Sequence, residues 1–124
     1  MIENAPARGR IPCHLFATFA MFRKDRVEWT KGEPATFESS SAAERGFCRV
    51  CGTPLFFRYK ASADMELTVG SFDHPEALEP KHHYGIESRV PWHVIGDALP
   101  RAETNAALRY LKDAWSYQDP AGAD

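Results

Sequence analysis

Two cysteines three positions apart, Cys48 and Cys51, constrain this chain more than any other feature of its sequence. A Cys-x-x-Cys pair closes a small loop that places two thiols on one side of a tight turn, and zinc sites use such loops to supply two of their four tetrahedral ligands. Gly52 follows the pair directly, where a positive φ is often needed and glycine adopts it without a Cβ penalty. The pair predicts a zinc-binding knuckle at residues 48–54, with Cys48 and Cys51 as metal ligands and zinc as cofactor.

Two other interpretations of the pair stay open. A redox dithiol uses the same spacing, but that chemistry prefers the first cysteine at a helix N-terminus, where its pKa is lowered. Here Pro54 and the Phe56-Phe57 run favour a strand after the pair. Alternatively, both cysteines are buried, reduced and without a ligand. The third cysteine, Cys13, is interpreted as a small core residue on an apolar strand.

A complete zinc site needs further ligands that the pair does not supply. Adjacent strand residues point to opposite faces, so only one residue of Cys13-His14, or of His82-His83, can face a metal. For each of the five histidines, a surface or hydrogen-bonded role is more common than metal ligation. The residues by themselves indicate no catalytic group.

Charge and hydropathy restrict the partners of the chain. Lys and Arg total 15 against 17 Asp and Glu, for a net charge of −2, which disfavours nucleic-acid binding because that needs a basic surplus. No run approaches the roughly 18 apolar residues of a membrane span. The polar residues 1–10 lack the apolar centre of a signal peptide. We therefore expect a cytoplasmic protein with neither a nucleic-acid nor a membrane partner.

The hydrophobic pattern predicts one mainly β domain. Short apolar or alternating segments are punctuated by 9 prolines and 8 glycines spread along the chain, as is typical of short strands joined by turns. The expected strands cover residues 13–22, 26–30, 35–39, 45–48, 55–59, 65–69, 82–87 and 92–95. The expected fold class is a compact, zinc-knuckle-type β fold of short, curled antiparallel strands with one C-terminal helix.

The last segment has a different period. Residues 103–117 contain neither Gly nor Pro and carry an apolar stripe at helical spacing, made of Ala107, Leu108, Leu111, Ala114 and Trp115. The expected organisation is an N-terminal arm at 1–12, a β domain at 13–100, and a C-terminal amphipathic helix and tail at 101–124.

Several motifs also occur in an order that resembles a known family. They are Trp-Thr-Lys-Gly-Glu-Pro-Ala-Thr-Phe at 29–37, Arg-Gly-Phe-Cys-Arg-Val-Cys-Gly-Thr-Pro-Leu at 45–55, Thr-Val-Gly-Ser-Phe-Asp-His-Pro at 68–75 and Glu-Ser-Arg-Val-Pro-Trp at 87–92. This set is similar to the glutathione-dependent formaldehyde-activating enzymes, a family that also includes centromere protein V. The resemblance runs from about residue 16 to residue 100.

The resemblance implies a β fold built around zinc and a carbon–sulfur lyase activity. The family reaction is the reversible condensation of formaldehyde with glutathione to S-hydroxymethylglutathione, in which zinc would bind and activate the thiol or polarise the carbonyl adduct as a Lewis acid. It implies a small thiol such as glutathione as partner. It also implies a structural zinc on an N-terminal Cys-x-Cys and a later Cys-x-x-Cys, of which the later pair matches Cys48 and Cys51. The family's catalytic zinc cysteines would fall near Glu3, Ala5 and Arg8, so no catalytic residue carries over.

These departures lead us to expect an N-terminally short, degenerate member of the family. The alternatives are a non-catalytic binding or scaffold domain that keeps the fold, and a redox dithiol of Cys48 and Cys51. Loss of an N-terminal segment exposes strand edges and apolar surface, so we expect a homodimer that covers them. Two knuckles across the dimer axis could build one tetrahedral zinc site.

Overall fold

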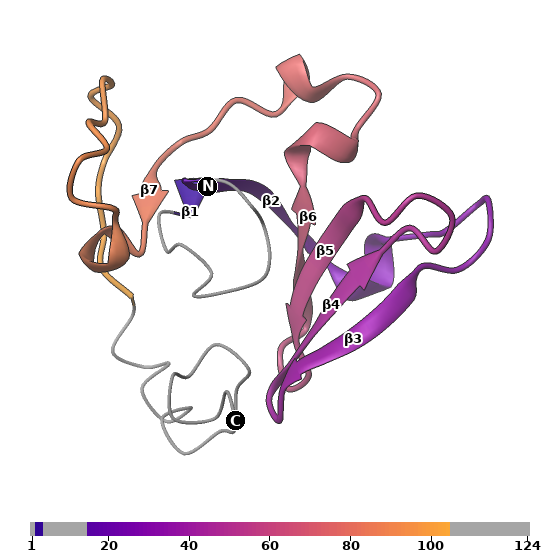
Figure 1. The fold of residues 1–124 in the computed structure, drawn as a ribbon. Coiled ribbons are helices and arrows are strands. Elements are labelled where there is room, and N and C mark those ends of the chain that lie inside the picture. Colours follow the sequence, from indigo (N-terminus) through magenta and orange to yellow (C-terminus); the bar gives the residue numbers. More distant parts are fainter. Residues whose placement is uncertain (1, 4–14, 105–124) are drawn as a thin grey trace.

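A computed structural model describes residues 2–3 and 15–104 of the chain. Its strands form a single sheet in the order β3-β4-β5-β6-β2-β1-β7 (Figure 1). The strands are β1 Ile2–Glu3, β2 Ala17–Arg23, β3 Ala35–Ser40, β4 Ala43–Phe47, β5 Pro54–Tyr59, β6 Asp64–Thr68 and β7 His83–Tyr84. Short 3-10 helices lie between them, namely η1 Lys24–Arg26, η2 Val69–Ser71, η3 Pro75–Ala77 and η4 Ile86–Ser88. The expectation of a mainly β fold is confirmed.

The antiparallel part of the sheet grows from consecutive hairpins. β3, β4, β5 and β6 pair with their neighbours in sequence, and β2 then adds to the free side of β6. In this register Phe22 of β2 lies opposite Met65, and Phe56 of β5 lies opposite Leu67. Among the strands described, only β1 and β7 pair in parallel, which the expectation of antiparallel strands did not include.

The core lies at the centre of this sheet. The buried apolar residues of the described part are Phe19, Ala43, Phe56 and Met65. Phe56 is opposite Gly46 of β4, and a Cβ on Gly46 would lie 2.0 Å from the Phe56 ring. Trp29 packs on the same ring with centroids 5.8 Å apart. Glycine is therefore required at position 46 so that the Phe56 ring can cross the neighbouring strand.

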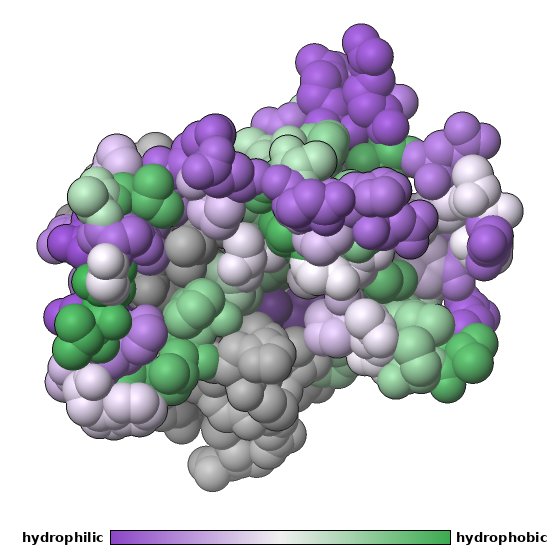
Figure 2. Space-filling model, turned by 90° about the horizontal axis from the view of Figure 1, so that it is seen from above, coloured by the Kyte–Doolittle hydropathy of each residue, from purple (hydrophilic) through white to green (hydrophobic). Residues whose placement is uncertain are grey.

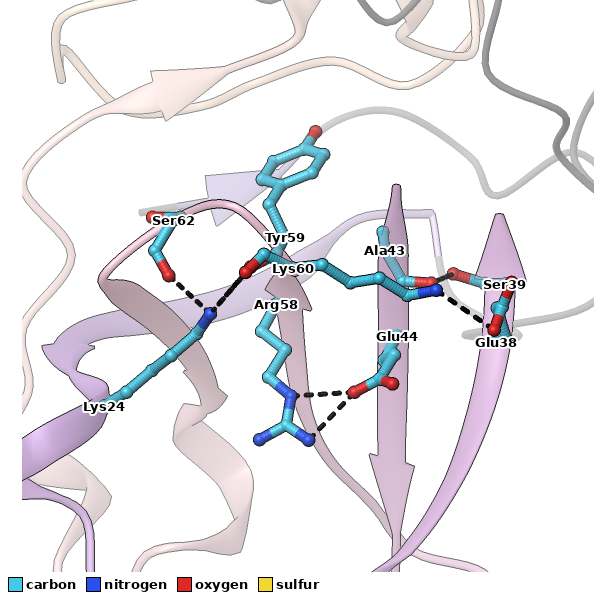
Figure 3. A network of polar contacts seen from close by, with 9 residues as sticks. All are labelled: Lys24, Glu38, Ser39, Ala43, Glu44, Arg58, Tyr59, Lys60 and Ser62. Carbon is cyan, nitrogen blue, oxygen red and sulfur yellow. Dashed lines mark hydrogen bonds and ion pairs between the residues drawn. The ribbon is translucent and has the colours of Figure 1, made fainter. Parts of the chain in front are cut away.

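Polar contacts tie the hairpins together across the strands (Figure 3). The Lys24 ammonium donates to the carbonyl oxygens of Tyr59, at 2.8 Å, and of Ser62, which fixes the β5–β6 turn to the end of β2. Arg58 of β5 pairs with Glu44 of β4 at 2.8 Å. These bonds replace water as partners of half-buried polar groups.

Two expected strands are wrong. The 26–30 segment is not in a strand, and its alternation reflects the packing of Trp29 on Phe56 rather than strand pairing. The 92–95 segment is not a strand either, because the His93 N–H donates to the Val90 carbonyl and closes a turn around Pro91. The expected 82–87 strand is limited to β7, because Gly85 at φ 65° leads into η4.

Some expectations fall outside the described residues. These are the C-terminal helix beyond Thr104, and the positions of Cys13 and His14. β1 lies within the segment expected as an N-terminal arm, and it pairs with both β2 and β7. None of the helices in the described part is long and apolar enough to cross a membrane.

Several large apolar side chains reach the surface. Figure 2 shows hydrophobic residues between hydrophilic ones on the face seen from above. The exposed large hydrophobic residues of the described part are Leu15, Phe16, Met21, Phe37, Val50, Trp92 and Val94. Val50 stands at the tip of the knuckle and is 91% exposed, so the knuckle projects from the sheet.

Candidate metal centre

The knuckle connects two neighbouring strands of the sheet. β4 ends at Phe47, and the chain returns as β5 at Pro54, which lies opposite Phe47. The Cys48 N–H donates to the Thr53 carbonyl at 2.9 Å, and the Gly52 N–H donates to the Cys48 carbonyl at 2.7 Å. Gly52 has φ 76°, so the expected need for a positive φ after the second cysteine is confirmed. The backbone thus forms a closed turn with both cysteines on it.

The two thiols differ in exposure and in hydrogen bonding. Cys48 is half-buried and Cys51 is exposed, and neither forms a disulfide. The Thr53 hydroxyl lies 3.1 Å from the Cys51 sulfur. Hydrogen bonds from Thr53, and then from Cys48, lower the pKa of the Cys51 thiol. A lowered pKa favours the thiolate, which is the form that binds metals and attacks electrophiles.

Thr53 was missed by the sequence analysis. Its only signal is a hydroxyl residue two positions after the second cysteine, and that spacing alone does not say that the side chain turns back toward the sulfur. The turn places it there because the Thr53 carbonyl is held by the Cys48 N–H. Thr53 therefore acts on the cysteine pair through its hydrogen bond to the Cys51 sulfur.

The knuckle fits half of a tetrahedral zinc site. It carries two thiols, and zinc in structural sites takes four ligands. Within residues 2–3 and 15–104, no group of three or more His, Cys, Asp or Glu side chains comes together. Within the described part of the chain, Cys48 and Cys51 are therefore a pair of thiols without a third candidate ligand beside them.

The described histidines include clear cases of other roles. His83 of β7 is buried, and its Nε2 lies 2.9 Å from both carboxylate oxygens of Asp97. His93 stacks on Phe16 with ring centroids 5.4 Å apart. His74 lies on the surface with its Nδ1 3.2 Å from a Glu76 oxygen. These are surface, stacking and hydrogen-bonded roles.

One carboxyl group of the sheet is held in an unusual environment. Glu66 of β6 lies opposite Phe57 and Met21 of the adjacent strands. Burial raises the pKa of Glu66, and the charge of Arg45 opposes this shift only in part. The Arg45 guanidinium lies 4.9 Å above the Phe57 ring. Sequence reasoning missed this group because its neighbours come from separate strands.

Fold and site together define a small, mainly β protein with a Cys-x-x-Cys turn between two adjacent strands. The family pattern described as Glutathione-dependent formaldehyde-activating enzyme matches residues 10–88, which is more than half of the chain. The chain belongs to this family, as the order of its motifs led us to expect. The match includes the knuckle and every strand from β2 to β7. A search of the curated proteins found no match.

Proposed function

We propose that this protein binds zinc through Cys48 and Cys51 and takes a small thiol such as glutathione, or its formaldehyde adduct, as its ligand. The family match supports the thiol and the adduct, because the family is described by glutathione and formaldehyde. The closed turn that carries both cysteines supports the metal, and it is the observation that carries the proposal. When bound there, zinc would supply a fixed tetrahedral centre for the fold.

We propose further that the chain is a degenerate member that binds this ligand without turnover. The positions at which the family's catalytic zinc cysteines are expected hold Glu3, Ala5 and Arg8. Zinc in a thiolate cluster needs deprotonated sulfur ligands, and these three side chains supply none. The odd number of cysteines argues against a disulfide framework and supports a reducing, cytoplasmic location.

Binding and turnover can be measured separately. Calorimetric titration with glutathione tests binding, and exchange spectroscopy with carbon-13 formaldehyde tests the rate of adduct formation. We expect glutathione to bind and the exchange rate to equal that in buffer. Faster exchange with the protein, abolished by Cys48→Ala, would contradict degeneracy. The absence of glutathione binding would overturn the assignment of the ligand.

An active carbon–sulfur lyase is the second candidate. It is favoured by the extent of the family match, which includes the knuckle and the strands from β2 to β7. It predicts glutathione-dependent loss of free formaldehyde with the purified chain, and zinc removal by a chelator would abolish that loss. The same exchange experiment separates this candidate from the degenerate form.

A redox dithiol is the third candidate. The lowered pKa of Cys51 favours it. The strand β5 after the pair counts against it, because redox pairs of this spacing sit at the start of a helix. Alkylation rates measured across pH 5 to 10 would test it. If neither thiol reacts as a thiolate at a pH below the ordinary pKa of cysteine, the redox candidate is excluded.

A further inference from the structure

We propose that one face of the sheet is a docking surface for the C-terminal segment of the same chain, residues 105–117, which packs there as an amphipathic helix. The apolar stripe of this segment consists of Ala107, Leu108, Leu111, Ala114 and Trp115. The segment lies beyond residue 88, where the family match ends, so the docking concerns a part of the chain that the family pattern does not cover. It depends on neither zinc nor glutathione.

The register of five adjacent strands defines the face. Residues directly opposite each other in antiparallel strands point to the same side of a sheet. The pairings run from β2 through β6, β5 and β4 to β3, and the row consists of Met21, Glu66, Phe57, Arg45 and Phe37. The Arg45 guanidinium lies 4.9 Å above the Phe57 ring, as expected for neighbours on one side. We call the side that carries this row the docking face.

The opposite side of the sheet has described partners of its own. Trp29, from the loop after η1, packs on Phe56 with ring centroids 5.8 Å apart. Phe72, which follows η2, packs on Phe22 with ring centroids 5.9 Å apart. That side therefore has an apolar layer formed by the described part of the chain.

The docking face is built like a surface that packs against a second layer. Phe19, two positions before Met21 on β2, is only 7% exposed, and Ala43, two positions before Arg45 on β4, is 3% exposed. Met21 itself is 62% exposed, and Phe37 is 42% exposed. Covering such side chains with an apolar stripe removes hydrophobic surface from water, which favours docking.

The segment starts from a fixed position at the edge of the sheet. The Thr104 N–H donates to Oε1 of Glu87 at 3.1 Å, and the Thr104 hydroxyl donates to the same oxygen. The Ala102 N–H donates to the carbonyl of His83 in β7 at 3.0 Å. Residue 105 therefore follows directly on a stretch that is bonded to β7, which lies beyond β1 and β2 in the strand order (Figure 1).

The segment is long enough to reach the docking face. A helix over residues 105–117 rises about 1.5 Å per residue and is about 20 Å long. Adjacent strands lie about 4.8 Å apart, so the four spacings from β7 to β5 amount to about 19 Å. The helix can therefore pass from its anchor at β7 to the Phe57 ring on β5. Tethering holds the segment at a roughly millimolar effective concentration, which favours its own chain over a second copy at micromolar protein.

Trypsin tests the docking, because Arg109 and Lys112 lie inside the segment. Cleavage needs a locally opened chain, so its rate reports how often the segment leaves the face. The natural full-length chain is digested, and cleavage after these two residues is followed by mass spectrometry. We expect it to be at least about tenfold slower than in a synthetic peptide of residues 103–119.

Variants locate the contact. Leu111→Gln removes an apolar side chain from the stripe and keeps the helix propensity, and it should raise the cleavage rate about tenfold. Met21→Gln does the same on the docking face and should raise the rate about threefold, since Met21 is partly exposed. The matched controls are Ser116→Gln, off the stripe, and Val94→Gln, at an exposed apolar residue of another loop. Both controls should leave the rate unchanged.

Three results would overturn the proposal. The first is cleavage of the natural chain as fast as that of the peptide. The second is protection that Leu111→Gln removes and Met21→Gln does not change, because the segment would then dock on another surface. The third is protection that grows with protein concentration, because a second copy would then bind the segment.

Far-UV circular dichroism checks that each variant is folded. If a variant does not fold, hydrogen exchange of the natural chain decides the question. Slow exchange throughout residues 105–117 at every protein concentration would support docking within one chain. Exchange as fast as in the peptide would overturn it.

Discussion

His83 of β7 and Asp97 of the loop beyond η4 are joined through their side chains, since the buried imidazole nitrogen Nε2 lies 2.9 Å from each carboxylate oxygen. The backbone reinforces this link. The His83 N–H donates to the Pro100 carbonyl at 2.7 Å, and the Ala102 N–H donates to the His83 carbonyl at 3.0 Å. Residues 97–102 are therefore attached to the edge of the sheet by a side-chain pair and by main-chain bonds.

The His83–Asp97 pair predicts a loss of stability in acid. The hydrogen bond from His83 lowers the pKa of Asp97 below its ordinary value of 3.8. A carboxyl whose pKa is lower in the folded state stabilises the fold above its ordinary value, and this contribution disappears as the pH falls through the folded-state value. Asp97→Asn should unfold more easily than the natural chain at pH 7, and the difference should shrink below pH 3.8. Urea titrations at several pH values measure it, and a constant difference would contradict the account.

The burial of Glu66 predicts a pH dependence of stability opposite to that of the His83–Asp97 pair. Burial raises its pKa above the ordinary value of 4.5. Its contribution to stability is therefore complete below pH 4.5 and declines as the pH rises through the folded-state pKa. Glu66→Gln should raise the free energy of unfolding at pH 7 relative to the natural chain and lose this advantage in acid. The exposed Glu28→Gln is the control and should stay within about 0.5 kcal/mol. A destabilised Glu66→Gln at pH 7 would refute the assignment.

Gly46 predicts a local packing failure. A methyl group there would lie 2.0 Å from the ring of Phe56, which is only 3% exposed and cannot move into solvent. Gly46→Ala should lower the free energy of unfolding by about 1–3 kcal/mol, the usual cost of overpacking a core. Gly96→Ala is the matched control, because a Cβ on Gly96 meets no atom within 4 Å. Equal effects of the two changes in thermal unfolding would contradict this packing.

Gly52 predicts a defect confined to the knuckle. Its φ of 76° is costly for any residue with a Cβ, so Gly52→Ala should lose about 1–2 kcal/mol of stability and also weaken zinc binding. Gly32 has φ 89° in a different turn. Gly32→Ala should therefore cost a similar amount of stability and leave zinc affinity unchanged. Competition with a coloured chelator measures the zinc affinity. An equal loss of zinc affinity in both variants would contradict the prediction that the Gly52 turn holds the metal.

The sequence predicted the local parts of the fold well. The strands β3, β5 and β6 lie within a residue of their expected bounds, because their alternating side chains and intervening turns are written in consecutive residues. The parallel pairing of β1 with β7 joins residues about 80 positions apart, and nothing local specifies it. Trp29 shows that alternating residues do not always form a strand, since its side chain packs on Phe56 while its segment lies outside the strands.

The sequence indicated the residues of the candidate site that lie within one motif, but not the contacts made by side chains in the folded chain. Cys48, Cys51 and Gly52 were identified because the motif itself closes the turn. The Thr53 contact and the His83–Asp97 pair depend on how side chains turn within the folded chain, and the second joins residues from separate elements. Such contacts carry no spacing rule that a single sequence could reveal.

X-ray absorption at the zinc edge of the purified full-length chain tests the central claim most directly, because it reports the atoms bound to the metal. The account predicts a sulfur shell at about 2.3 Å from zinc. That shell should be retained in Cys13→Ser and lost when Cys48 and Cys51 are both changed to Ser. Protein without zinc, or zinc surrounded only by nitrogen and oxygen atoms at about 2.0–2.2 Å, would contradict it.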